Sequence, residues 1–217
     1  EDGSIRFGLL TGSYGKNLAG GVLRKDIKKF AKNNDASDDE VDLDSGIFAS
    51  AVNGIVSNID AIRFAHWDGS IHTDCNTHSI TLAQIKSPSA STRCSSWGNP
   101  ISEIYAEALR YFSGTGSATP DFVPAAADEP LGLDILSAWE DPLQADEWCA
   151  NCSIILLSTG TNSFDGDDLD TPVGDLYNLS RATLDSQFTD VVGDLEQGGA
   201  FSGTYFVGSN GSLEDAS

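Results

Sequence analysis

The sequence has 217 residues, of which 40% are hydrophobic, and this is enough apolar material for a single domain with its own core. Its 33 acidic residues against 12 basic residues give a net charge of -21, which repels the phosphates of nucleic acids and of anionic lipids and argues against binding to either. The longest apolar run, residues 154–157, is too short to span a membrane, and a start at Glu1 without a signal peptide suggests a mature or trimmed fragment.

The N-terminal segment predicts a β-hairpin. Residues 5–10 are strand-like, residues 12–21 are rich in turn-forming residues, and the strand pattern resumes at Val22. A basic run over residues 24–32 then leads directly into an acidic run over residues 35–44. We interpret these two runs as a solvated loop whose halves partly neutralise each other, with a calcium or partner site in the acidic run as the alternative.

Three segments predict amphipathic helices. Apolar side chains recur at helical spacing over residues 47–64 and 184–195, and a Gly-Gly pair ends the second pattern. Between them, Asn99 can cap a helix whose first position suits Pro100. The apolar stripe of this helix consists of Ile101, Ile104, Tyr105, Ala108, Leu109 and Phe112.

The remaining segments predict two strands and two surface excursions. Residues 153–157 form a short continuous apolar run, which is typical of a strand covered on both faces, and residues 203–207 predict a last strand. Residues 66–96 and 113–148 are polar or rich in proline and predict long surface loops. Helices and strands in this order indicate one α/β domain over residues 1–217.

Four cysteines suit two disulfides in an oxidising compartment, because they are even in number and fall into close pairs. The pairs are Cys75 with Cys94, which would pin the first surface loop, and Cys149 with Cys152. A zinc site would need all four thiolates to converge. A Cys-x-x-Cys redox motif normally opens a helix, whereas here it precedes the apolar run. We therefore favour disulfides.

Two polar segments could hold a metal ion. The loop after the predicted buried strand lies where open α/β sheets bind ligands, and its carboxylates could hold a hard cation such as Ca²⁺. These carboxylates are Asp165, Asp167, Asp168 and Asp170. Imidazoles beside carboxylates suit a transition metal, and the first surface loop carries His66, His72 and His78. An ordinary solvated loop is the simpler interpretation of both segments.

No catalytic constellation stands out. The sequence lacks a Gly-x-Ser-x-Gly elbow, a Walker phosphate loop and a Rossmann glycine fingerprint. Ser, His and Asp residues are present, but in this composition their mere presence carries no weight. We therefore expect a protein that is not an enzyme and that acts by binding.

Four segments in succession resemble the PilC/PilY family of type IV pilus tip-associated adhesins. They are residues 6–25 (RFGLLTGSY leading into GGVLRK), residues 94–112 (CSSWGNPISEIY continuing through ALRYF), residues 139–157 (WEDPL, then WC, then the apolar run) and residues 203–208 (GTYFVG). Their order and approximate spacing match over most of the chain.

The resemblance implies a von Willebrand factor A-like domain, which is a doubly wound sheet with an antiparallel edge hairpin and long surface loops, here incomplete at its N-terminus. Family members are exported through the periplasm to the outer membrane or the pilus tip, where they serve in pilus assembly and adhesion. Minor pilins or other pilus-tip proteins are thus expected partners, and a host or surface receptor is a further one. The β-propeller that carries the family's calcium site matches no segment of this sequence.

Many A-type domains bind ligands through a metal ion held by three loops. Asn99 stands where the second loop of the family pattern has Thr, Thr159 stands where the third loop has Asp, and the Asp-x-Ser-x-Ser of the first loop is missing. A divalent ion thereby loses a carboxylate ligand. We expect no certain cofactor, with Ca²⁺ as the candidate, and contact through an acidic, disulfide-pinned surface instead of metal-bridged ligand capture.

Overall fold

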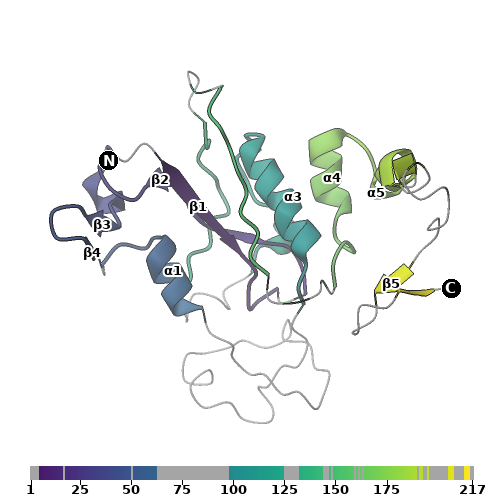
Figure 1. Ribbon diagram of the computed structural model, residues 1–217, viewed down its shortest axis with the longest axis horizontal. Coiled ribbons are helices and arrows are strands. Elements are labelled where there is room, and N and C mark those ends of the chain that lie inside the picture. Colours follow the sequence, from purple (N-terminus) through teal and green to yellow (C-terminus); the bar gives the residue numbers. More distant parts are fainter. Residues whose placement is uncertain are drawn as a thin grey trace, which may run out of the picture.

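A computed structural model of the protein (Figure 1) describes residues 5–16, 18–49, 51–62, 98–124, 132–143, 149–158, 164–189, 205–207 and 213–215, and also residues 147, 160, 162, 191, 192 and 195.

Strands β1 (Arg6–Thr11) and β2 (Val22–Lys29) form the hairpin that the sequence predicts. They pair antiparallel, with a register shift on each side of Leu9. The turn between them requires a glycine at position 20, because Gly20 has a left-handed φ of +56° and a Cβ there would lie 2.0 Å from the ring of Phe122.

Residues 24–29 of the basic run belong to strand β2, so the expectation of a solvated loop is wrong for them. Arg24 is only 1% exposed. Its guanidinium group donates hydrogen bonds to the hydroxyl of Thr11 (2.9 Å) and to the carbonyl oxygens of Gly12 (2.8 Å) and Asp134 (2.7 Å). The charge can be buried because these oxygens replace the water that it loses.

The partial neutralisation expected between the basic and acidic runs is confirmed. Lys25 and Lys28 form ion pairs with the two carboxylate oxygens of Asp38, at 2.9 and 2.7 Å. These contacts, with Lys28 first, lower the pKa of Asp38. Asp38 belongs to a short 3-10 helix, η1 (Ala36–Asp38), whose N-cap is Asp35.

The helix predicted over residues 47–64 forms only in its second half. Helix α1 covers Ile55–Ala61, whereas Ile47–Phe48 form strand β4 and pair antiparallel with strand β3 (Val41–Asp42). Gly46, with a φ of +70°, lies in the turn between the two strands. Residues 47 and 48 belong to this hairpin, and α1 begins only after its N-cap residue, Gly54.

A buried carboxylate marks the beginning of α1. Glu40 is 4% exposed, and its Oε2 accepts a hydrogen bond from the backbone amide of Val56 at 3.1 Å. The carboxyl group lies so close to Gly54 that a Cβ there would be 2.0 Å from it. The negative charge at the N-terminus of α1 stabilises the helix, since the helix dipole is positive at that end.

Helix α3 (Ile101–Phe112) is the second helix that the sequence predicts, and it lies beside the β1–β2 hairpin (Figure 1). Its residue Tyr111 packs edge-on against Trp139, with ring centroids 5.6 Å apart. Leu23 and Ala118 complete this core cluster. The hydroxyl of Tyr111 also accepts a hydrogen bond from the backbone amide of Ile27 at 2.8 Å, which ties α3 to β2.

The described part of residues 113–148, which is predicted to be a surface loop, also contributes buried side chains to the core. Phe122 is fully buried and Trp139 is 7% exposed. An isolated bridge pairs Leu136 with Leu23, on the side of β2 that faces away from β1. The prolines prevent long regular elements in this segment, but they do not prevent its apolar side chains from reaching the core.

The prediction of a covered strand at residues 153–157 is wrong, because these residues do not form a strand in the structure. The described residues 151–158 have no regular secondary structure, and Ile155 and Leu157 are 80% and 90% exposed. No strand of the described part pairs with this segment. Without a neighbouring strand its backbone has no hydrogen-bonded ladder and its side chains have no cover.

The C-terminal part contains one helix that the sequence did not reveal. Helix α4 (Asp170–Tyr177) lies beside α3 and leads to helix α5 (Arg181–Leu184) and a π-helical turn (Asp185–Thr189) in the region of the predicted third helix (Figure 1). The predicted last strand is present as β5 (Tyr205–Val207), which pairs with strand β6 (Leu213–Asp215).

All strand pairs among the described residues are antiparallel and form two-stranded sheets. The doubly wound, von Willebrand factor A-like sheet that the resemblance implies therefore stays a prediction. In the part of the chain that the structure describes, no helix has the length and apolar character needed to cross a membrane.

Candidate functional site

The loops that the sequence singled out meet at the N-terminal end of α3. The side-chain amide of Asn99 donates hydrogen bonds to the hydroxyl of Ser158 (3.0 Å) and to the carbonyl oxygen of Gly160 (3.1 Å). Pro100 is the N-cap residue of α3 instead of the expected Asn99. The side chain of Asn99 therefore joins the loop before α3 to the loop after residues 153–157.

Asp165 supplies the capping group that Pro100 lacks. Its Oδ1 accepts a hydrogen bond from the backbone amide of Ser102 at 2.7 Å, and its Oδ2 accepts from the hydroxyl of Ser102 at 2.9 Å and from the side-chain amide of Asn162 at 3.0 Å. A carboxylate at this end of a helix satisfies an unpaired amide and interacts favourably with the helix dipole. The residue proposed as a calcium ligand thus has a structural role at the start of α3.

Glu103 ties three segments together from inside the protein, where it is fully buried. Its Oε2 accepts a hydrogen bond from the amide of Gly20 (2.6 Å), and its Oε1 accepts from the amides of Gly166 (3.0 Å) and Asp168 (3.2 Å). Burial raises the pKa of Glu103, and the three amide donors oppose this rise. The carboxylate thereby fastens both the β1–β2 turn and the aspartate loop to α3.

The other aspartates of this loop do not converge on one point. Asp167 is exposed, and Asp170 accepts a hydrogen bond from the backbone amide of Arg181 at 3.3 Å. The pKa of Asp168 is raised, first by burial and then by the charge of Asp167. Among the described residues, no group of three or more His, Cys, Asp or Glu side chains is placed to hold a metal ion. The calcium site at Asp165, Asp167 and Asp170 therefore stays a prediction.

A second buried charged cluster lies further along α3. The guanidinium group of Arg110 donates to Glu107 (2.7 Å) and Thr119 (2.8 Å) through Nη1, and to Asp175 on α4 through Nη2 (2.7 Å) and Nε (3.1 Å). Its central carbon lies 5.6 Å from the ring centroid of Trp139. Glu107 is fully buried and Arg110 is 3% exposed. This cluster fastens α4 to α3.

Sequence reasoning missed the charged buried face of α3, although a signal for it exists. Glu103, Glu107 and Arg110 follow each other at intervals of four and three residues, which places them on one face of a helix. The apolar side chains of α3 recur with the same helical period on a neighbouring face. Their pattern predicted that the apolar face, and not the charged one, is buried. In the structure that stripe is only partly buried, and its Tyr105 is 44% exposed.

Several predicted site residues lie outside the described residues, and one predicted bond is not made. His66, His72, His78, Cys75, Cys94 and Thr159 belong to the first group. Cys149 and Cys152 are exposed and free, so the disulfide expected between them is absent from the structure. The thiol of Cys152 instead lies 3.7 Å from the carbonyl oxygen of Ala150.

Comparison with known proteins gives two matches. Residues 7–217 match the family model described as the second domain of PilY1 homologs. A relative from Xylella fastidiosa (strain Temecula1), named type IV pilus biogenesis factor PilY1 homolog, is 27% identical over 231 residues. The alignment covers 99% of this chain but only 15% of the relative. No solved structure matches the sequence.

Proposed function

Because the chain belongs to the family of PilY1 homologs, we propose that it is a binding module that serves type IV pilus biogenesis at the cell surface. The observation that carries this proposal is the family match, which extends over residues 7–217. The relative's name assigns pilus biogenesis to a whole protein, of which the matched region is 15%. In our proposal this region contributes by contact with other proteins and not by catalysis.

The geometry at the start of α3 supports a role in contact. Glu103 and Asp165 use their carboxylates to hold the loops around α3 in place. A surface whose loops are fixed in advance loses little conformational entropy when a partner binds. We propose an A-type domain, in which the ligand contacts lie at the end of the fold that corresponds to the start of α3. Asn99 and Asp165 would hold the contacting loops in position there.

The proposed partners are proteins of the pilus. Minor pilins or other pilus-tip proteins would contact the domain during assembly, and a host or surface receptor would contact it during adhesion, after export through the periplasm to the outer membrane or the pilus tip. A net charge of -21 favours partners with cationic surfaces over anionic ones.

The alternative function is that of a secreted domain that binds a divalent cation, and the contacts of the described aspartates do not favour it. Asp165 is engaged with Ser102, and Asp170 faces the backbone of Arg181. A thermal unfolding series with and without millimolar Ca²⁺ tests it, because an ion that binds only the native state raises the Tm by mass action. An increase that Asp167→Asn with Asp170→Asn removes would favour the cation-binding function over our proposal.

The proposed function is tested in a bacterium that makes the full-length protein. Deleting its gene should reduce both the surface pili recovered by shearing and the attachment of cells to a surface. A tagged full-length protein should retain minor pilins in a pull-down from the same cells. Normal pili, normal attachment and no retained pilin would together overturn the proposal.

A matched pair of variants then tests the contact surface itself. Asp165→Ala removes the capping carboxylate at the start of α3, whereas Asp141→Ala removes an exposed aspartate elsewhere. If the loops around α3 contact a pilin, only Asp165→Ala should weaken pilin retention. Equal retention by both variants, at equal protein levels, would place the contact elsewhere on the chain.

A further inference from the structure

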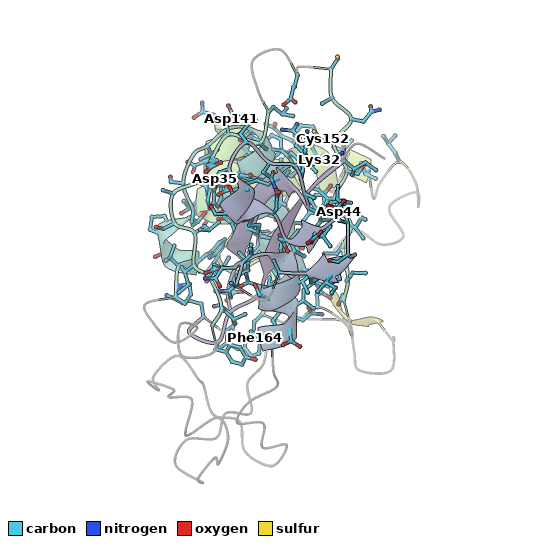
Figure 2. The ribbon with its side chains drawn as sticks, turned by 90° about the vertical axis from the view of Figure 1, so that its left-hand side faces the viewer. Lys32, Asp35, Asp44, Asp141, Cys152 and Phe164 are labelled. Carbon is cyan, nitrogen blue, oxygen red and sulfur yellow. The ribbon has the colours of Figure 1, made fainter. Side chains whose placement is uncertain are left out.

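A groove lies between residues 31–32, which follow strand β2, and the β3–β4 hairpin, on the side of the molecule away from α4. Its volume is about 400 Å³. Its apolar lining comes from Ala31, Val41, Leu43 and Ala49, and its carboxylates are those of Asp39, Asp42 and Asp44. Figure 2 looks onto this side of the molecule and shows Lys32, Asp35 and Asp44 there, whereas Phe164 lies at the lower end of the view. The groove is thus separate from the loops around α3.

The hairpin beside the groove exposes large apolar side chains. Leu43 is 52% exposed, Ile47 is 67% exposed and Phe48 is 53% exposed. These three residues lie within six consecutive positions, and they flank the turn that contains Gly46. Large exposed apolar side chains beside polar groups are a feature of interaction surfaces.

Backbone hydrogen bonds hold the walls of the groove in place. The carbonyl oxygen of Phe30 accepts from the amides of Glu40 (2.8 Å) and Val41 (3.0 Å), which joins the end of β2 to the hairpin. The amide of Ala49 donates to the carbonyl oxygen of Glu40 at 2.9 Å and closes the other side. A partner therefore meets a groove that exists before binding, and this reduces the entropy that binding costs.

Two of the groove carboxylates, those of Asp39 and Asp42, are held by neutral donors. Asn33 donates to Asp39 from its backbone amide and from its side chain, both at 2.8 Å, and the backbone hydrogen bond is the main reason that the pKa of Asp39 is lowered. Asp42 accepts from the amides of Asp44 (2.9 Å) and Ser45 (3.2 Å). These hydrogen bonds fix the side chains without removing their negative charge.

Charge distinguishes the groove from two other residues of the acidic run, Asp38 and Glu40. Asp38 is neutralised by two lysines, and Glu40 is buried at the start of α1. In contrast, none of the three groove aspartates forms an ion pair with another described residue. Lys32 is the cation that lines the groove, so three carboxylates face one ammonium group.

We propose that this groove, with the apolar tip of the β3–β4 hairpin, is the docking site for a cationic peptide segment of a partner protein. An apolar side chain of the segment fills the groove against Val41 and Leu43, and its lysines or arginines pair with Asp42 and Asp44. The negative charge of the groove favours a cationic occupant. The exposed apolar residues favour an occupant that also carries apolar side chains. This inference does not depend on the pilus role proposed above.

The test uses the full chain and a fluorescein-labelled model peptide of about twelve alternating leucines and lysines, followed by fluorescence anisotropy. Two double variants change the docking site: Asp42→Asn with Asp44→Asn in the groove, and Leu43→Ser with Phe48→Ser in the groove and on the adjoining strand β4. A third, Asp121→Asn with Asp167→Asn, removes the same charge from exposed positions elsewhere. All changed residues are exposed, so thermal unfolding should show that every variant folds.

We expect each groove variant to raise the peptide Kd about tenfold, and the control variant to change it less than about twofold. Equal weakening by the control would show general attraction to an acidic protein and would overturn the proposal. The proposal would also be overturned if Ca²⁺ alone binds to the chain and Asp42→Asn with Asp44→Asn abolishes that binding, because this result would identify an ion site. Sedimentation that shows a dimer, lost in Leu43→Ser with Phe48→Ser, would assign the surface to a second copy of this chain and would also overturn it.

Discussion

Helix α3 and residues 153–157 place charged and apolar side chains in opposite ways. The helix buries Glu103, Glu107 and Arg110, whereas Ile155 and Leu157 in the other segment are almost fully exposed. The difference lies in the partners that each segment finds. Each buried charge meets donors or acceptors inside the protein, whereas no described strand covers the apolar segment. Burial in this protein therefore follows hydrogen-bond partners and neighbouring strands, and not the polarity of a residue alone.

The largest expected effect comes from removing the cation of the buried cluster. Arg110→Met should lower the free energy of unfolding by about 3–5 kcal/mol, because Glu107 would keep a buried negative charge without its partner. Urea unfolding followed by circular dichroism measures the loss. Glu107→Leu combined with Arg110→Met should lose less, since neither charge then remains buried. A loss below about 1 kcal/mol for Arg110→Met would show that the cluster is not buried as described.

Glu103→Gln should lower the free energy of unfolding by about 1–3 kcal/mol. The glutamine side chain keeps one oxygen acceptor but turns an NH₂ group towards amides that also donate, so at least one buried donor loses its partner. Asp167→Asn, in the exposed part of the same loop, is the matched control and should change stability by less than about 0.5 kcal/mol. Similar losses in both variants would contradict a special role of Glu103.

The pH dependence of the two kinds of carboxylate should have opposite signs. Burial raises the pKa of Glu103 above its ordinary value of 4.5, so the folded protein binds this proton more tightly than the unfolded chain. Its contribution to stability is present below pH 4.5 and is lost as the pH rises through the folded pKa. The lysines lower the pKa of Asp38 below 3.8, so its contribution is present above pH 3.8 and is lost as the pH falls through the folded pKa.

Unfolding of the two variants over a range of pH values checks this sign difference. The stability deficit of Glu103→Gln relative to the parent should shrink as the pH rises from 4.5 to neutrality, whereas that of Asp38→Asn should shrink as the pH falls below 3.8. Comparing each variant with the parent at the same pH removes most of the general effect of the net charge. Deficits that change with pH in the same direction would contradict our account of Glu103.

Sequence patterns within a short segment predicted the elements that depend mainly on the residues of that segment. The β1–β2 hairpin follows from two apolar stretches around a glycine-rich turn, and α3 follows from its apolar period and from Pro100 at its start. The beginning of α1 depends on Glu40, which lies outside the helix and caps it from a distance of 16 residues. Periodicity within a segment carries no information about such a partner.

The candidate site was predictable only in its location. Asn99 and the segment around Asp165 were singled out from the sequence, and the structure does bring their loops together around α3. The role of Asp165 was not predictable, because an aspartate in a polar loop has the same local pattern whether it binds an ion or caps a distant helix. Glu103 was missed because a charged residue on a helix is ordinarily assigned to its solvent face.

The smallest expected effect concerns the apolar segment. Leu157→Ser should change the free energy of unfolding by less than about 0.5 kcal/mol, because the side chain is already 90% exposed and contributes little burial. Leu23→Ala, at a residue that is 2% exposed, should cost about 2–4 kcal/mol and serves as the comparison. Both variants are measured by urea unfolding. A cost for Leu157→Ser close to that for Leu23→Ala would mean that residues 153–157 are covered after all, as their uninterrupted apolar character predicts, and would remove the contrast with α3.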